Sequence, residues 1–325
     1  MPTMLGRGEC GGHLTLVFTI EDSSDDLLWQ GSRGVGICVE DGVEAIAKGE
    51  SGGGSLIVRF LDESYHSALY QDVLNRLIEE LPQTGEVDWE LSIKIGLPAS
   101  QGFGMSASGA VAAAIAFQRA MGVPHEECVR RSYMIAHLVE RGNSSGLGDT
   151  TALSSGGVVR RNSAGSPYSG ELLDNGPGES EGWSIATPVL LCWRDKTGTL
   201  TSGYIDDPLW KEKISLAGEA EMERIGAGGW KRERWEDLIE ASLSFSSSSE
   251  LESEAARKEL KDEVNGSISE LGLSEELVAL MCMLGESLVV VPKNPEKPGN
   301  WMSKLVDELE RCGISSRHSR VSRTR

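Results

Sequence analysis

The hydrophobic pattern near residue 100 predicts a strand, a glycine-rich turn and a helix in that order. Residues 89–95 alternate between apolar and polar side chains, the period of a half-buried strand, and the alanine-rich residues 107–120 are expected to be helical. The connecting residues 96–106 contain three glycines and two serines. Main-chain N–H groups can converge in such a turn, and the helix dipole favours an anion there, so the pattern predicts a polyphosphate site. The alternative is a turn that only connects a strand to a buried helix.

Further strands are expected on both sides of this segment. Residues 37–40 and 43–47 flank Asp41-Gly42, a dipeptide typical of hairpin turns, so a β-hairpin is predicted there. Other strands are predicted for residues 55–60, 185–193 and 288–291.

Two helices and one break are also predicted. Residues 66–81 place apolar side chains on one helical face, and Pro82 ends that pattern. Pro124 stands where it can open another helix, which is expected to run to about residue 141. Gly, Ser and Asn are frequent over residues 162–182, which are expected to form a domain boundary or an insertion. The basic tail, residues 317–325, either frays or adds a last strand.

Composition and charge argue against several classes of protein. With 325 residues the chain can form two domains or one large one. Its net charge of −19 argues against a nucleic-acid partner, because phosphate backbones bind basic surfaces. No apolar run approaches the ~20 residues of a membrane span and no signal-peptide pattern opens the chain, so a cytoplasmic protein is expected. The six cysteines are widely spaced, which argues against a zinc site and a disulfide framework.

Two segments resemble a known family. Residues 98–107 resemble the second motif of the GHMP kinase superfamily, a proline followed by Gly-Leu-Gly-Ser-Ser-Ala, with Phe103 for the leucine and Met105 for the first serine. Residues 140–161 resemble the archaeal pantoate kinase branch, which carries Glu-x-Gly-x-x-x-Gly-Leu-Gly-Asp and then Gly-Gly-x-x-x-Arg. Shorter segments that resemble the same branch are residues 11–15, 31–36 and 283–287.

The resemblance implies an α+β fold with the two-domain architecture of GHMP kinases. The N-terminal half is then expected to be similar to domain 2 of ribosomal protein S5, and the C-terminal half to be ferredoxin-like. We expect the first domain over residues 1–170, with the phosphate loop and the catalytic aspartate, and the second over residues 183–325.

The resemblance also implies roles for single residues. Asp149 matches the catalytic base, which acts on the acceptor hydroxyl when it is ionised and within hydrogen-bond reach. Glu140 and Ser106 match the residues that bind Mg²⁺, and Ser108 is the alternative to Ser106 because the register of the motif is open by a residue or two. The residues expected to bind the nucleotide are Pro98, Gly102, Phe103, Gly104, Met105, Ser106, Ala107 and Ser108.

A hydroxy-acid substrate would need a cation for its carboxylate. Arg161 matches the arginine after the Gly-Gly pair, and a guanidinium can hold a carboxylate through two parallel hydrogen bonds. Arg160 is the alternative, since neighbours on a strand face opposite sides and only one of the two should reach the site. His13 and Arg33 are further candidates on the substrate side.

Several of these residues have a plainer structural alternative. Asp149 and Ser106 could each cap a helix. Glu140 could be an exposed carboxylate, and His13 could be a structural hydrogen-bonding group.

The implied function is that of a pantoate kinase, which uses ATP and Mg²⁺ to phosphorylate the 4-hydroxyl of (R)-pantoate on the route to coenzyme A. The alternatives are a GHMP kinase for shikimate, homoserine or mevalonate, a phosphate-assisted decarboxylase, and a non-catalytic sensor. No lysine precedes Lys48, unlike in mevalonate-type GHMP kinases, which favours the pantoate branch. The glycine-rich third motif of the superfamily has no residue-by-residue match. The expected partner is a small-molecule substrate, and a homodimer is left open.

Overall fold

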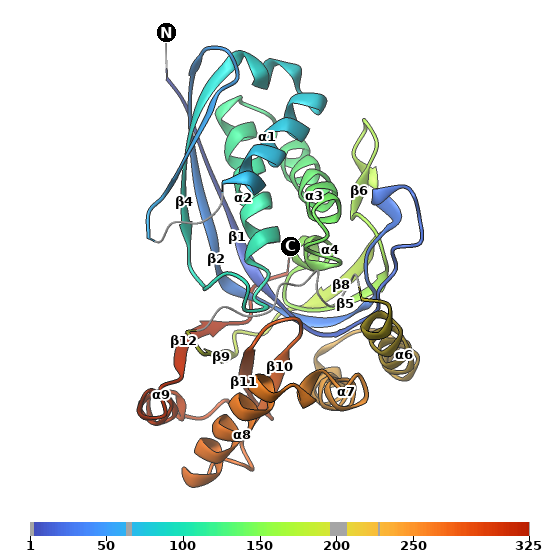
Figure 1. Ribbon diagram of the computed structural model, residues 1–325, viewed down its shortest axis with the longest axis vertical. Helices are drawn as coiled ribbons and strands as arrows, with labels where there is room; N and C mark the ends of the chain where they lie inside the picture. Colours follow the sequence, from blue (N-terminus) through green and yellow to red (C-terminus); the bar gives the residue numbers. More distant parts are fainter. Residues whose placement is uncertain (1–2, 63–66, 196–206, 227, 325) are drawn as a thin grey trace.

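The computed structural model describes residues 3–62, 67–195, 207–226 and 228–324 and shows two sheets with helices packed on them (Figure 1). In the first sheet the strand order is β3-β4-β2-β5-β8, and β1 pairs with β2 along nearly its whole length. The strands of this sheet are β1 (Met4–Phe18), β2 (Gly34–Ser51), β3 (Leu56–Phe60), β4 (Val87–Ile95), β5 (Val158–Ser163) and β8 (Glu179–Trp183).

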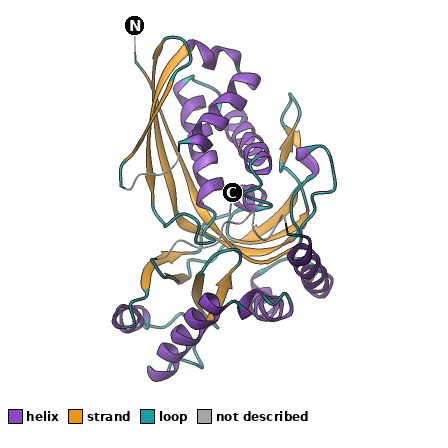
Figure 2. Ribbon diagram, viewed as in Figure 1, coloured by secondary structure: helices purple, strands orange, loops and turns teal. Residues whose placement is uncertain are grey.

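Helices cover one face of the first sheet, as Figures 1 and 2 show. The helix α2 (Met105–Ala120) lies directly on β1 and β2, with α1 (Ala68–Glu80) and α3 (His125–Gly142) beside it. The short helix α4 (Asp149–Ser155) follows α3 and leads into β5. The structure therefore confirms the predicted strand, glycine-rich turn and helix around residue 100, with the helix beginning at Met105. Residue 66, the first of the predicted helix 66–81, lies outside the described residues.

The C-terminal part forms a second antiparallel sheet with the strand order β10-β11-β9-β12. This order and the helices between its strands correspond to the expected ferredoxin-like half. Its strands are β9 (Pro188–Trp193), β10 (Leu277–Cys282), β11 (Ser287–Pro292) and β12 (Ser315–Arg320), and its helices are α6 (Pro208–Ile225), α7 (Trp235–Ser248), α8 (Ala255–Glu270) and α9 (Met302–Arg311). No helix in the described ranges is both long and apolar enough to cross a membrane.

The predicted hairpin at Asp41-Gly42 is wrong, because β2 runs without a turn from residue 34 to residue 51. Its partner β1 stays paired on both sides of this dipeptide, and a register shift between Gly11 and Gly12 takes up the irregularity. The carboxylate of Asp41 accepts hydrogen bonds from the side chains of Ser319 and Arg317, which belong to β12. Long-range pairing therefore outweighs the local turn preference.

The segment over residues 162–182 extends the first sheet. It contains the small hairpin of β6 (Tyr168–Ser169) and β7 (Asp174–Asn175), and it then enters β8, which pairs with β5. The chain also returns to the first sheet at its end, where Val321 bridges to Val39 and Thr324 to Gly156. The predicted division at residues 170 and 183 stays a prediction. Of the predicted basic tail, residues 317–320 lie in the strand β12.

Close contact between β1 and α2 sets the position of the predicted phosphate loop, residues 96–106. A Cβ on Gly6 or Gly8 would overlap the carbonyl oxygens of Ala116 and Ala112, respectively. Larger side chains on the facing surface of α2 would push the helix away, which explains its alanine-rich sequence. The N-terminus of α2 is therefore held at a fixed height above the sheet.

We expect Gly8→Ala to lower the free energy of unfolding by about 3 kcal/mol, because an overpacked contact must move backbone atoms. The matched control is Gly53→Ala, since a Cβ at Gly53 would meet no atom within 4 Å. Urea unfolding followed by circular dichroism measures both changes. Equal unfolding midpoints for the two variants would contradict the close packing of α2 on β1.

Candidate active site

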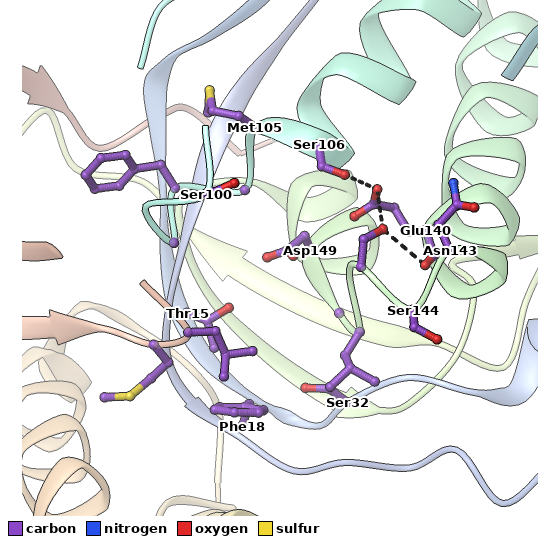
Figure 3. Close-up of a pocket in the computed structure, with 18 residues that line it drawn as sticks. Thr15, Phe18, Ser32, Ser100, Met105, Ser106, Glu140, Asn143, Ser144 and Asp149 are labelled. Atoms are coloured by element: carbon purple, nitrogen blue, oxygen red, sulfur yellow. Dashed lines mark hydrogen bonds between the residues drawn. The ribbon is translucent and has the colours of Figure 1, made fainter. Parts of the chain in front are cut away.

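A cavity of about 270 Å³ opens where the N-termini of α2 and α4 approach the end of α3 (Figure 3). In this view Asp149 lies between the Ser106–Glu140 pair on one side and Thr15 and Phe18 on the other. The residues that line the cavity are Thr15, Phe18, Ser32, Ser100, Gly102, Phe103, Gly104, Met105, Ser106, Glu140, Asn143, Ser144, Ser145, Leu147, Gly148, Asp149, Met283 and Leu284.

The phosphate loop has the backbone geometry that its glycines predict. Gly102 and Gly104 have φ angles of 76° and 70°, in the left-handed region that glycine adopts without strain. The main-chain N–H of His13 on β1 donates to the carbonyl of Phe103 at 3.0 Å, which ties the loop to the sheet. Gly104 is the N-cap of α2, so the free N–H groups of the first helical turn lie at the cavity.

The turn between β10 and β11 packs against this loop. A Cβ on Gly102 would lie 3.0 Å from the carbonyl oxygen of Met283, and a Cβ on Gly285 would overlap the backbone of Gln101. The N–H of Met283 also donates to the carbonyl of Thr15 at 2.9 Å. Met283 and Leu284 thus bring the C-terminal part of the chain to the cavity, although the third motif of the superfamily has no residue-by-residue match in this segment.

Glu140 is a buried carboxylate among hydroxyl groups. It is 3 % exposed, and it accepts hydrogen bonds from the side chains of Ser106 and, at 3.0 Å, Ser145. Burial raises the pKa of Glu140 to about 7, against the lowering effect of the hydrogen bond from Ser106. The alternative of an exposed carboxylate is therefore wrong.

This group of oxygen atoms fits a magnesium ion. A hard cation prefers carboxylate and hydroxyl oxygens, and Mg²⁺ keeps several waters or phosphate oxygens as further ligands. Within the described residues, no cluster of three or more His, Cys, Asp and Glu side chains offers an all-protein cage. A site with few protein ligands, completed by phosphate oxygens, is the kind that Ser106 and Glu140 can form.

Ser106 and Ser108, the two candidates for this hydroxyl, face different surroundings. Ser108 is fully buried, donates to the carbonyl of Cys10 at 2.7 Å and accepts from the N–H of Val43 at 3.0 Å. Its side chain ties α2 to the sheet, whereas Ser106 lines the cavity. Ser106 is not the N-cap of α2, which is Gly104.

Of the residues expected to bind the nucleotide, Pro98, Ala107 and Ser108 do not line the cavity.

Asp149 is the first residue of α4, and the N-cap of that helix is Gly148, so the alternative of Asp149 as an N-cap is wrong. Its Oδ1 lies 2.6 Å from Nδ1 of His13. Burial alone would raise the pKa of Asp149, but the hydrogen bond from His13 and the nearby charge of Arg161 hold this pKa below its usual range. The carboxylate is therefore ionised at neutral pH, as a group that accepts or orients a hydroxyl proton requires.

None of the three residues predicted to bind the substrate lines the cavity. His13 and Arg161 lie behind Asp149, and neither lines the cavity. Arg33 pairs with Glu219 and, at 3.2 Å, with Glu21, and it does not line the cavity. A direct contact of these residues with a substrate stays a prediction.

Arg160 and Arg161 face opposite sides of β5, as the alternation of a strand predicts. Arg160 donates to the carboxylate of Glu181 at 2.6 Å and to the carbonyl of Ile225 at 2.9 Å. Its guanidinium carbon lies 5.5 Å from the ring centre of Trp230. Arg160 therefore belongs to the packing of α6 and its following loop, and Arg161 is the arginine that faces the site.

Some lining residues were not singled out from the sequence. Ser145 contributes the second hydroxyl at Glu140, from the turn that follows α3. Thr15 and Ser32 add hydroxyl groups, whereas Phe18 and Leu147 add apolar surface. Thr15, Ser32 and Ser145 belong to segments whose family resemblance was noted, but only the folded chain shows that they meet at one cavity.

The segment that forms the centre of this site matches a known protein family. Residues 68–157 match the family described as "GHMP kinases N terminal domain". The matched segment includes the phosphate loop, Glu140 and Asp149. This part of the chain is therefore similar to the N-terminal domain of GHMP kinases.

A curated protein similar to this chain is named "Pantoate kinase", from Methanospirillum hungatei. The two are 30 % identical over 162 residues, which cover 48 % of this chain and 52 % of the other protein. The chain thus matches about half the length of this relative.

Solved structures show the same fold over nearly the whole chain. A "Phosphotransferase related to CoA biosynthesis pathway" has a TM-score of 0.74 at 22 % identity and covers 99 % of this chain and 98 % of its own. A structure described as "MDDEF in complex with MVAPP, AMPPCP and Magnesium" has a TM-score of 0.63 at 11 % identity, with 98 % and 97 % covered. The chain therefore shares the α+β fold of these structures.

Proposed function

We propose that this chain is an ATP- and Mg²⁺-dependent kinase for a small molecule, and that its acceptor is the 4-hydroxyl of (R)-pantoate. The observation that carries the proposal is the convergence of three features on one cavity. These are the main-chain N–H groups of the phosphate loop, the Ser106–Glu140 pair and the ionised Asp149. The similarity to a pantoate kinase, 30 % over half of the chain, supports the choice of acceptor.

Different residues of the cavity serve different parts of phosphoryl transfer. The N–H groups at Gly102–Ser106 hold the phosphates of the nucleotide, and the α2 dipole adds to this attraction. Ser106 and Glu140 hold Mg²⁺, which neutralises charge on the phosphate oxygens when it is bound. Asp149 accepts a hydrogen bond from the acceptor hydroxyl and keeps its oxygen directed at the phosphorus.

The part of the cavity beside Asp149 suits a small branched hydroxy acid. Phe18 and Leu147 supply apolar surface for methyl groups, and the hydroxyl of Thr15 supplies a hydrogen-bonding partner. No Lys or Arg among the described residues lines the cavity, so hydroxyl and main-chain groups make the first contacts with a carboxylate.

The test is an acceptor panel with purified protein, ATP and Mg²⁺. With (R)-pantoate we expect release of ADP and formation of 4-phosphopantoate, which ³¹P NMR detects. For shikimate, homoserine and mevalonate we expect kcat/KM to be at least about 100-fold lower. The reason is that a site built for one set of hydrogen bonds rejects acceptors that leave them unmade. Faster turnover of one of the other acceptors contradicts the choice of pantoate. Release of carbon dioxide would instead indicate a phosphate-assisted decarboxylase.

A further inference from the structure

Three buried side chains form a hydrogen-bonded row behind the cavity. Oδ1 of Asp149 lies 2.6 Å from Nδ1 of His13, and Nε2 of His13 lies 3.3 Å from Nη1 of Arg161. The Asp149 side chain is 22 % exposed, whereas that of His13 is fully buried and Arg161 is 1 % exposed. Only the aspartate end of the row is therefore open to a substrate.

The chemistry of the row decides which nitrogen of His13 carries its proton. A guanidinium can only donate hydrogen bonds, so Nε2 of His13 must accept from Arg161. The proton of a neutral imidazole is then on Nδ1, which donates to the Asp149 carboxylate. Burial lowers the pKa of His13, more than the neighbouring Asp149 raises it, so the ring is neutral at neutral pH.

Arg161 is held in place and is not free to turn into the cavity. It donates to the carbonyl of Ser32 at 3.2 Å, to the Ser32 hydroxyl at 3.1 Å and to the carbonyl of Val17 at 3.3 Å. A Cβ at Gly148 would lie 2.6 Å from Nε of Arg161, so the loop before α4 covers the guanidinium from the cavity side. Although burial lowers the pKa of Arg161 to about 10, it remains charged at neutral pH.

We propose that His13 and Arg161 are positioning residues for Asp149 and that neither binds the acceptor directly. Arg161 fixes the tautomer of His13, and the Nδ1–H of His13 orients the Asp149 carboxylate for the acceptor hydroxyl. This inference rests on the proposed function only where it assigns the hydroxyl to Asp149. The fixed tautomer follows from the contacts of the row alone.

The first test reads the tautomer without any enzymatic activity. In ¹⁵N-histidine-labelled protein at pH 7, we expect the signal of His13, identified by its loss in His13→Asn, to show the proton on Nδ1. In Arg161→Met the donor to Nε2 is gone, and we expect a population with the proton on Nε2. An Nε2-protonated or doubly protonated His13 in the unmodified protein overturns the proposal.

The second test separates positioning from substrate binding. In His13→Asn the side-chain amide N–H can take the place of the Nδ1 proton, whereas His13→Ala removes the donor. We expect His13→Ala to lower kcat about 100-fold with little change in the acceptor KM. We expect the kcat of His13→Asn to be about tenfold higher than that of His13→Ala. An increase in the acceptor KM at unchanged kcat, or equal losses in both variants, overturns the proposal.

The two tests also keep this inference apart from the proposed function. If unmodified protein phosphorylates none of the acceptors, the proposed function fails, while the tautomer of His13 still decides the arrangement of the row. If His13→Ala does not fold, the proposal is tested by the kcat of His13→Asn relative to that of the unmodified protein and by the tautomer of His13.

Discussion

Replacing Asp149 by asparagine is expected to lower kcat about 1,000-fold and to leave the affinity for ATP nearly unchanged. The carboxylate is ionised, it lies at the cavity, and the His13 hydrogen bond orients it. An amide has a similar shape but cannot accept the acceptor proton. The proposed nucleotide contacts come from the loop at Gly102–Ser106, which the substitution does not touch. Steady-state kinetics and titration with a fluorescent ATP analogue measure the two quantities.

The matched control is Asp174→Asn, an equal change of charge at an exposed position of the β6–β7 hairpin. We expect wild-type kinetics for this variant. If Asp149→Asn retained full activity, the base assigned here would be wrong. If Asp149→Asn lost ATP binding to the same extent as kcat, the residue would act through the nucleotide site and not through the acceptor.

Replacing Glu140 by glutamine is expected to lower activity at subsaturating Mg²⁺ by about 100-fold, the upper end of what loss of a residue supporting a metal costs. The buried carboxylate supplies the charged oxygen of the proposed metal site, and an amide oxygen carries no net charge. The quantity to measure is the concentration of free Mg²⁺ that gives half-maximal turnover.

The pH dependence of the same quantity follows from the pKa of Glu140, which burial raises to about 7. Mg²⁺ binds the ionised carboxylate, so protonation at lower pH competes with the metal. Lowering the pH from 8 to 6 is therefore expected to raise the required free Mg²⁺ about tenfold in the unmodified protein. Glutamine does not titrate, so Glu140→Gln should lose this part of the pH dependence. An identical pH dependence in both proteins would show that Glu140 is not the titrating metal ligand.

Local patterns were reliable where short-range physics decides the structure. The alternation over residues 89–95, the glycine-rich residues 96–106 and the alanine-rich residues 107–120 predicted a strand, a turn and a helix, all of which the structure confirms. Strand alternation also predicted that Arg160 and Arg161 face opposite sides. Each of these features depends on neighbours a few residues away.

The hairpin at Asp41-Gly42 shows where such patterns fail. A turn dipeptide has a modest local preference, whereas β2 gains a continuous ladder with β1 and contacts from β12, which is more than 260 residues away in the sequence. The choice between Ser106 and Ser108 was equally out of reach, because it depends on which side of α2 faces the sheet and which faces the cavity.

From the order of its residues alone, this chain is assigned a phosphate loop, a buried helix behind it, an acidic surface charge and a set of candidate side chains. Folding decides which of these candidates meet. Glu140 gains its raised pKa from burial beside Ser106 and Ser145, and His13 and Arg161 come to lie behind Asp149 instead of lining the cavity. The reason is that burial, desolvation and hydrogen bonds between distant segments arise only when α2, α3, α4 and β1 pack together, and no spacing along the chain encodes their distances.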